Sequence, residues 1–362
     1  MGFHYYDDAD RNLESMLETV KFLDTAEETF ADCVTVPVSM PDEVYGFLHE
    51  CAITEYRGVL FASWYNNHTT ELQGRCPIRG KRSYDGGLTW EHEEVICDDP
   101  TGKIMFCPPV YGKADGHLYM LINQMVGPDL IHALDCYILN EETDRFELLW
   151  SRPVPFKLNT NVIPLPNGKL MIAGRVCELD GFPNTPAVLI SDDGKIDTKW
   201  RLVKIAENGD LPDGSAFVHP EIWPIIDGDT IWMFCRNDRR RVPIVFRSDD
   251  RGETWSSPMA YDIPAVSSKI CCGTLTDGRH WWIGNITHSD RRRLALYLTE
   301  PGTMRFTKCR ILHDSAEPGW DNAVNWHYPA AVEHDGKLYI ICTVGCGSWA
   351  RRGAAVTIVD LK

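Results

Sequence analysis

A two-stranded pattern recurs six times along the chain. Each copy is an apolar run, a short turn and a second apolar run that ends in polar residues, as in Val162–Arg175. Asp-Gly and Asn-Gly turns between apolar strands are a strong hairpin signal. The glycines that close the six turns lie about 50 to 60 residues apart, near the repeat length of four-stranded propeller blades. They are Gly58, Gly116, Gly168, Gly228, Gly278 and Gly336.

A second turn follows each of the first five copies and belongs to the outer half of the same unit. These turns end in aromatic residues at nearly constant spacing: Trp90, Phe146, Trp200, Trp255 and Phe306. Two hairpins per unit make a four-stranded sheet. Six such sheets bury their faces by stacking radially. The pattern therefore predicts an all-β protein, a six-bladed β-propeller of four-stranded blades.

The two ends of the chain predict how the ring closes. The last unit has strands at 330–344 and 353–360 but no outer hairpin, while residues 33–39 form a strand without a partner in the first unit. We expect this N-terminal strand to complete the final blade. Residues 10–30 combine helix formers with apolar residues at helical spacing, which predicts a short amphipathic helix. The expected organisation is an N-terminal helical extension (1–32), which could supply a homo-oligomer contact, and a single propeller domain (33–362).

Charge and composition exclude several classes of partner. A formal net charge of −16 would repel phosphate backbones, so we expect no nucleic-acid partner. No apolar run approaches the roughly 20 residues that span a bilayer, and the N-terminus does not resemble a signal peptide, so we expect a cytoplasmic protein without a membrane partner. The thirteen cysteines are scattered through apolar stretches without zinc-site spacing. They are interpreted as reduced thiols, and no cofactor is expected; a divalent ion at the pocket finds no support in ligand spacing.

Two of the outer turns carry a family resemblance. Ser83–Trp90 (SYDGGLTW) and Ser248–Trp255 (SDDRGETW) match the Asp-box pattern Ser-x-Asp-x-Gly-x-Thr-Trp, and the turns at 191–200 and 299–306 look like degenerate copies. The chain thus resembles the sialidase-like (BNR repeat) propeller superfamily. The resemblance implies binding or cleavage of a terminal sugar in the axial pocket. The Arg-Ile-Pro element of sialidases, part of an arginine triad for the substrate carboxylate, is absent. The resemblance therefore does not imply sialic acid as the substrate.

Propeller geometry places the candidate site opposite the glycine turns and Asp boxes. Inner strands begin there and second strands end there, and polar residues occur at nearly every such position, which favours a polar-ligand pocket. The catalytic candidates are His49, His219, Glu221 and Tyr328. The substrate-binding candidates are Glu50, Arg79, Gln124, Arg175, Arg236, Lys269, Trp326 and His327.

Each candidate has a chemical reason and a structural alternative. Histidine can move a proton near neutral pH, and Arg175 with Arg236 could hold a substrate carboxylate by bidentate bonds, with Arg79 joining them. Trp326 is a natural sugar-stacking aromatic. The alternatives are half-buried structural histidines and surface ion pairs of the arginines with Asp238, Glu178 or Asp180. The runs 239–241 and 291–293, three arginines each, are expected to lie in solvated loops.

Three functions remain open from the sequence. The first is an exo-acting glycosidase that cleaves a terminal acidic or deoxy-sugar from an oligosaccharide, with Glu221, Glu50 and Tyr328 as the reacting groups. The second is a uronate-directed lyase, similar to rhamnosyl-glucuronate lyases, with His49 or His219 as base and Arg175 and Arg236 as the clamp. The third is a non-catalytic sugar-binding propeller.

Overall fold

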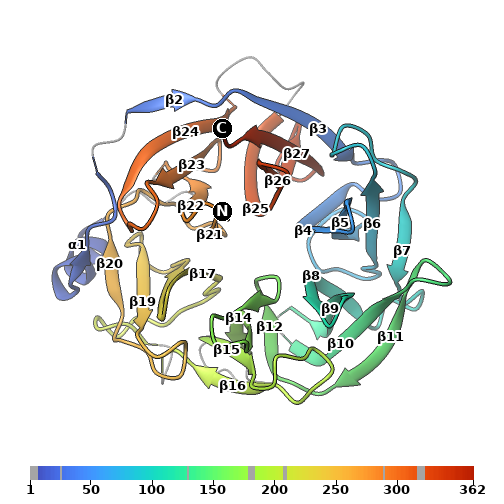
Figure 1. Cartoon of the computed structure of the whole chain (residues 1–362), viewed down its shortest axis with the longest axis horizontal. Coiled ribbons are helices and arrows are strands. Elements are labelled where there is room, and N and C mark those ends of the chain that lie inside the picture. Colours follow the sequence, from blue (N-terminus) through green and yellow to red (C-terminus); the bar gives the residue numbers. More distant parts are fainter. Residues whose placement is uncertain are drawn as a thin grey trace.

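Six β-sheets stand around a central axis in the computed structural model, which describes residues 7–24, 27–128, 130–177, 184–206, 210–287, 290–315 and 323–362 (Figure 1). Successive sheets follow one another in chain order around the ring, so each is one propeller blade. This confirms the predicted all-β, six-bladed propeller. None of the helical segments in this part of the chain has the length and apolar character needed to cross a bilayer.

The first three blades run from the inner strand outward in chain order. Blade 1 contains β4 (Phe47–Tyr56), β5 (Val59–Asn67), β6 (Ile78–Ser83) and β7 (Glu94–Cys97). Blade 2 contains β8 (Met105–Ala114), β9 (His117–Gly127), β10 (Leu130–Asn140) and β11 (Arg145–Arg152). Blade 3 contains β12 (Phe156–Leu158), β13 (Ile163–Pro164), β14 (Leu170–Val176), β15 (Thr185–Ser191) and β16 (Arg201–Lys204).

The other three blades each gain a strand from the N-terminal segment. Blade 4 contains β17 (Ile222–Asp227), β18 (Thr230–Cys235), β19 (Ile244–Ser248) and β20 (Met259–Tyr261), with β1 (Thr19–Val20) at its edge. Blade 5 contains β21 (Cys271–Thr274), β22 (His280–Asn285), β23 (Arg293–Thr299) and β24 (Phe306–Asp314), with β2 (Glu28–Phe30) at its edge. Blade 6 contains β25 (Ala323–His334), β26 (Lys337–Cys346), β27 (Arg352–Asp360) and β3 (Cys33–Ser39).

The turns that defined the repeat have the geometry their residues require. All six turn glycines have positive φ, between 60° at Gly228 and 84° at Gly278, a region that other residues enter only with strain. In the first Asp box, Ser83 Oγ accepts from Gly87 N at 2.8 Å, and Asp85 accepts from the hydroxyl and backbone N–H of Thr89. These bonds lower the pKa of Asp85 to about 2. The box at 248–255 repeats the pattern, so both boxes stabilise turns on the face opposite the inner-strand starts.

The ring closes as the sequence predicts. β3 pairs antiparallel with β27, so that Val36 lies opposite Val356, and it supplies the outer strand that the last repeat lacks. The two ends of the chain therefore share one sheet. All thirteen cysteines are free thiols, in agreement with their interpretation as reduced residues.

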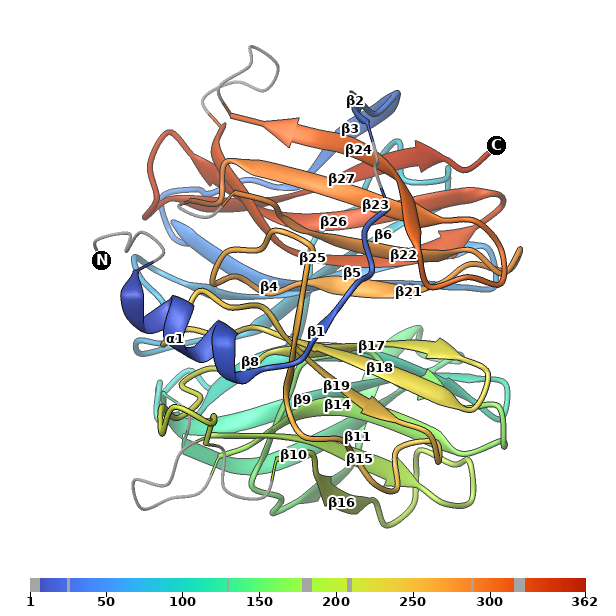
Figure 2. The same cartoon turned by 90° about the vertical axis from the view of Figure 1, so that its left-hand side faces the viewer.

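The N-terminal helix is confirmed, but it is shorter than the stretch that predicted it. Helix α1 covers Asp8–Met16, with Asp7 as its N-cap, and the chain then becomes extended. β1 adds in parallel to β20, and β2 adds in parallel to β24. Figure 2 shows this segment crossing the outer side of blades 4 and 5. The open edges of those blades provide backbone partners that outweigh the helical spacing of residues 17–30.

Helix α1 is anchored to blade 4 by a buried side chain, which gives a stability prediction. Leu13 is fully buried within the core shared by blades 3 and 4, whereas Met16 on the same helix is 50% exposed. Leu13→Ala should therefore lower the free energy of unfolding by about 2–4 kcal/mol. Met16→Ala is the matched control and should change it by no more than about 0.5 kcal/mol. Urea denaturation of both variants measures the difference, and equal losses would contradict this docking of the helix.

Candidate functional site

Two neighbouring inner strands are distorted where they face the axis. The pairing register shifts after His49 in β4 and after His327 in β25, and the next residues, Glu50 and Tyr328, have positive φ of 47° and 56°. A non-glycine residue held in this region costs about 1–3 kcal/mol, and such strain gathers at functional sites. A β-bulge also redirects side chains. Here it lets two consecutive residues of each strand reach the central cluster described next.

Arg236 is the hub of this central cluster. It follows β18, while Glu221 precedes the adjacent β17, and the two are joined by the bond from Arg236 N to Glu221 O. Arg236 Nη1 donates to Glu221 Oε2 and to Tyr328 Oη, both at 2.5 Å. Its Nε donates to Asp238 Oδ1 at 2.8 Å. One guanidinium thus places a carboxylate from blade 4 beside a phenol from blade 6.

The protonation states of these groups follow from burial and charge. Burial disfavours the charged form of Glu221, but the positive charges of Arg236, Lys269 and Arg175 outweigh it and hold its pKa below the ordinary value. Burial raises the pKa of Tyr328 well above its ordinary value, although Arg236 opposes the shift. At neutral pH the pair is therefore a carboxylate base and a neutral phenol.

A second buried pair, Lys269 and Glu50, also lies close to Tyr328. Lys269 Nζ, from the segment before β21, is 3.5 Å from Glu50 Oε2. The same nitrogen lies 5.9 Å from the centre of the Tyr328 ring, and the Glu50 charge also raises the pKa of that tyrosine. The sequence candidates Glu50, Lys269, Glu221, Arg236 and Tyr328 therefore form one cluster. Arg175, buried in β14, acts electrostatically on its carboxylate Glu221.

The three candidate histidines differ in their surroundings. His49 is buried, its ring centre is 4.1 Å from that of Tyr328, and its Nδ1 is 2.9 Å from Thr343 Oγ1. Burial, followed by the charge of Arg352, lowers the pKa of His49 and that of His327 well below the ordinary value, so both are neutral. His219 is half-exposed, and its Nδ1 lies 3.0 Å from Asp238 Oδ2.

Three predicted substrate-binding residues have their described contacts elsewhere. Arg79 forms an ion pair with Glu93 and lies over the Tyr45 ring. Gln124 donates to both oxygens of Asp135 on the neighbouring strand β10. Trp326 is buried in the hydrophobic core and stacks on His313 with 3.6 Å between ring centres. The structure does not bring these side chains into the central cluster, because each is already bound within or between blades.

The site also contains residues that the sequence analysis missed. Arg291, expected in a solvated loop, lies 5.3 Å from the rings of both Tyr328 and Trp349. Arg352, the first residue of β27, is buried and stacks between Phe47 and Trp349. The available signal was position, since Trp349 and Arg352 follow the second strand of blade 6 on the face already assigned to the site. Of the alternative partners considered for the arginines, Glu178 and Asp180 lie outside the described residues, and Asp238 does pair with Arg236.

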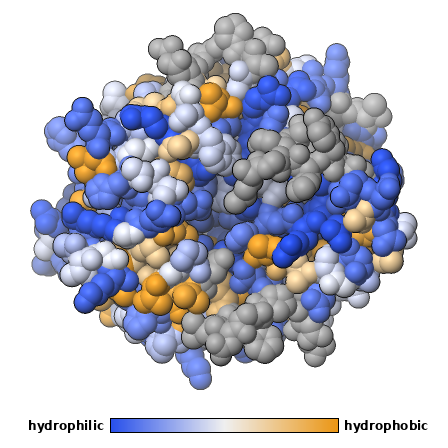
Figure 3. All heavy atoms as spheres, turned by 180° about the vertical axis from the view of Figure 1, so that it is seen from behind, coloured by the Kyte–Doolittle hydropathy of each residue, from blue (hydrophilic) through white to orange (hydrophobic). Residues whose placement is uncertain are grey.

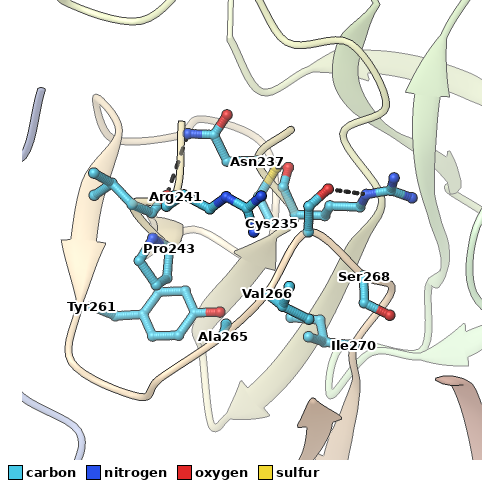
Figure 4. Close-up of a pocket in the computed structure, with 12 residues that line it drawn as sticks. Cys235, Asn237, Arg241, Pro243, Tyr261, Ala265, Val266, Ser268 and Ile270 are labelled. Atoms are coloured by element: carbon cyan, nitrogen blue, oxygen red, sulfur yellow. Dashed lines mark hydrogen bonds between the residues drawn. The ribbon is translucent and has the colours of Figure 1, made fainter. Parts of the chain in front are cut away.

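A small cavity lies behind Arg236, between blades 4 and 5. Its volume is about 10 Å³, and Asn237, Arg241, Tyr261 and Ile270 are among the residues that line it (Figure 4). A volume of this size holds at most a single water molecule. It is therefore not the substrate pocket. The hydrogen bonds from Arg236 Nε to Ser267 and from Asn237 to Val242 O lie at its wall, and they help to fix the arginine.

The site opens on the face where the inner strands begin. Hydrophilic residues predominate around the middle of this face (Figure 3). Within the described ranges, no group of three or more His, Cys, Asp or Glu side chains could hold a metal ion. The chemistry that the described residues themselves offer is that of a phenol, three carboxylates, neighbouring histidines and several cations.

Comparison with known proteins agrees with this architecture. The BNR repeat-like domain family matches residues 58–340 of the chain. No curated protein is detectably similar in sequence.

Several solved structures share the fold. A protein of unknown function from Dyadobacter fermentans is 14% identical, with a TM-score of 0.67 over 91% of this chain and 98% of that one. Trypanosoma rangeli sialidase in complex with sialic acid is 13% identical, with a TM-score of 0.68 over 93% of this chain and 60% of that one. The K499G mutant of the NanB sialidase from Streptococcus pneumoniae is 12% identical, with a TM-score of 0.65 and coverages of 90% and 71%. This chain thus spans about 60% of the trypanosomal enzyme, and at these identities the likeness is one of fold.

Proposed function

Because this chain belongs to the BNR repeat-like domain family, we propose that it is an exo-acting glycosidase that cleaves a terminal acidic or deoxy-sugar from an oligosaccharide. The observation that carries the proposal is the shared hydrogen bonding of Glu221 and Tyr328 to one nitrogen of Arg236. Tyrosine serves as the nucleophile in sialidases, which depart from the two-carboxylate rule of other glycosidases. Sialidase structures share the fold of this chain, and that likeness adds weight to the proposal.

The proposed roles follow from the protonation states. Tyr328 Oη attacks the anomeric carbon, and the carboxylate of Glu221 accepts the phenolic proton as the bond forms. Arg236 keeps both oxygens in place and stabilises negative charge as it develops on the phenol. Glu50 is our candidate for the group that protonates the leaving oxygen, and the ammonium group of Lys269, with which Glu50 is paired, supplies that proton. Water then releases the sugar from the tyrosine.

One observation favours a second candidate function, elimination across a uronate. The half-exposed His219 is oriented by Asp238, an arrangement that suits a general base. His49, the other candidate base, is less suitable, since burial keeps its pKa well below the ordinary value and Thr343 occupies its Nδ1. Elimination would also need a cation at the substrate carboxylate, and Arg291 or Arg236 could supply it.

A single assay separates these functions. The protein is incubated with sialosides and with rhamnosyl-uronate oligosaccharides, while released sugar and the ultraviolet absorbance of an unsaturated uronate are followed in the same sample. We expect sugar release without absorbance, and loss of that release in Tyr328→Phe but not in the control Tyr111→Phe, which removes a buried hydroxyl in blade 2. Rising absorbance that depends on His219 would establish the lyase. Binding without turnover on either set would favour the non-catalytic propeller.

A further inference from the structure

A cationic and aromatic group of side chains lies beside the catalytic candidates, on blade 6. Arg352 begins β27, Trp349 lies in the loop before it, and His327 lies on β25. The ring of His327 stacks on that of Trp349, with 5.3 Å between their centres and 15° between their planes. His327 also lies 5.5 Å from Tyr328, so this group adjoins the central cluster.

The guanidinium of Arg352 stacks against two aromatic rings, those of Phe47 and Trp349. The Phe47 ring lies 4.4 Å from it and the Trp349 ring 4.5 Å, which leaves the N–H groups at its edge for hydrogen bonding. Nε donates to Trp349 O at 3.1 Å, whereas Nη1 is buried without a hydrogen-bond partner. An aromatic-stacked arginine with a free edge is suited to planar recognition of an anion.

His327 also has buried nitrogens without hydrogen-bond partners. It has no exposed surface, and neither of its ring nitrogens has a hydrogen-bond partner. A neutral imidazole carries one donor and one acceptor, and a buried polar group without a hydrogen-bond partner destabilises the protein. Three buried nitrogens, Arg352 Nη1 and both ring nitrogens of His327, therefore have no hydrogen-bond partner within the described residues. A polar ligand would supply one.

Charge distinguishes this group from the central cluster. Arg236 is paired with Glu221 and Asp238, and Lys269 with Glu50, but neither Arg291 nor Arg352 forms an ion pair with any described residue. The carboxylate whose charge acts on Arg352 is that of Glu71, an exposed residue bound by Tyr65 Oη at 3.2 Å. Arg352 is buried and Arg291 is partly buried, and cations withdrawn from water without a paired anion are destabilising. The region is thus short of negative charge.

We propose that Arg352, His327 and Trp349 form a second subsite that binds an anionic substituent, a carboxylate or a sulfate ester, on the sugar next to the one cleaved. The proposal rests on the proposed function and extends it to the leaving-group side of the substrate. Tyr328, Arg352 and His327 are buried, whereas Trp349 is 46% exposed, so this group leads from the depth of the reacting groups to the surface, the direction in which the rest of the substrate extends. The substrate is then an acidic oligosaccharide with charge beyond its terminal residue.

The test compares substrates that share a terminal sugar and differ in the second one, which is neutral, a uronate or sulfated. The wild-type protein should prefer a charged second sugar in kcat/KM by about 10- to 100-fold, the range expected of charge-assisted hydrogen bonds. Arg352→Gln should bring that preference close to one. The matched control is Arg351→Gln, since Arg351 is exposed and donates to Pro41 O at 3.1 Å, and it should keep the full preference. The uronate and sulfate arms identify which anion is recognised.

A binding measurement separates this proposal from the proposed function. Tyr328→Phe, which lacks the nucleophile, is titrated calorimetrically with glucuronate, glucose and inorganic sulfate, with and without Arg352→Gln. Binding of glucuronate over glucose that depends on Arg352 supports the subsite even if no substrate is turned over. A preference for glucuronate unchanged by Arg352→Gln would overturn the subsite and leave the glycosidase intact. Binding of inorganic sulfate as strong as that of glucuronate would also overturn it, because the sugar ring would then contribute nothing to recognition.

Discussion

Tyr328→Phe is expected to lower kcat on a cleaved substrate by about a thousandfold or more, which corresponds to about 4 kcal/mol of lost transition-state stabilisation. The variant loses one oxygen, and in the proposed mechanism that oxygen forms the bond to the anomeric carbon. The Phe ring can keep the contact with His49, whose ring centre lies 4.1 Å away. Arg236 keeps Glu221 and Asp238 as partners. Stability should therefore fall by only about 1 kcal/mol, and kcat on the best substrate from the release assay is the quantity to measure.

Two results would contradict this role of Tyr328. Retention of more than about a tenth of the wild-type kcat by the folded variant would exclude the phenol as nucleophile, because loss of a nucleophile is not compensated to that degree. A similar loss in the control Tyr111→Phe would show that removal of any buried hydroxyl disturbs the fold enough to abolish activity. Circular dichroism and the unfolding midpoint of both variants must accompany the rates.

The fold could be predicted from the sequence because the repeat depends on residues that act within single turns. A turn that needs positive φ uses glycine, and an Asp box needs Ser, Asp and Thr at fixed spacing, whatever lies around it. Ring closure by residues 33–39 could also be predicted, since an unpaired strand and an incomplete blade require each other. The strands at 19–20 and 28–30 could not. Their partners β20 and β24 are distant in sequence, and the helical spacing of apolar residues in this segment predicted a helix instead of strands.

The site could be predicted only in part, and the bulges explain much of the difference. Regular alternation places only one of two adjacent strand residues inward, so His49 and Glu50 competed for one position. The bulge lets both reach the cluster, and it does the same for His327 and Tyr328. Trp326, one residue earlier, keeps the regular alternation and lies in the core. A period-two pattern contains no signal for where the register shifts.

Runs of arginine illustrate a second limit. Arg291 and Arg292 are adjacent, but Arg291 faces the Tyr328 ring while Arg292 is exposed and pairs with Asp290. Arg351 and Arg352 divide in the same way, and composition does not distinguish the members of either pair. What separates them is the tertiary position of aromatic rings that come from other segments. The same adjacency supplies matched controls for experiment.

Arg236→Met should reveal how strongly the central cluster depends on one cation. In the folded protein Arg236 pairs with Glu221 and Asp238, both of them largely buried. Removal of one partner of a buried ion pair leaves an uncompensated charge and typically costs about 3–5 kcal/mol. We expect a loss of that size in the free energy of unfolding at pH 7, measured by urea denaturation. Arg247→Met is the control in the same blade, since Arg247 pairs with the exposed Asp249, and it should cost no more than about 1 kcal/mol.

The pH dependence of this loss tests its electrostatic origin. In the wild-type protein the pKa values of Glu221 and Asp238 lie below their ordinary values, so their contribution to stability is present at neutral pH and is lost as pH falls below about 4. Without Arg236, burial acts against ionisation with less opposition and the two pKa values rise, although Lys269 and Arg175 still favour the Glu221 carboxylate. The variant then takes up protons on folding, so its stability rises as pH falls. The difference in free energy of unfolding between the wild-type protein and Arg236→Met should therefore become smaller between pH 7 and about pH 4.5. A deficit that stays constant over this range would instead mean that Arg236 contributes through the shape and hydrogen bonding of its side chain rather than its charge.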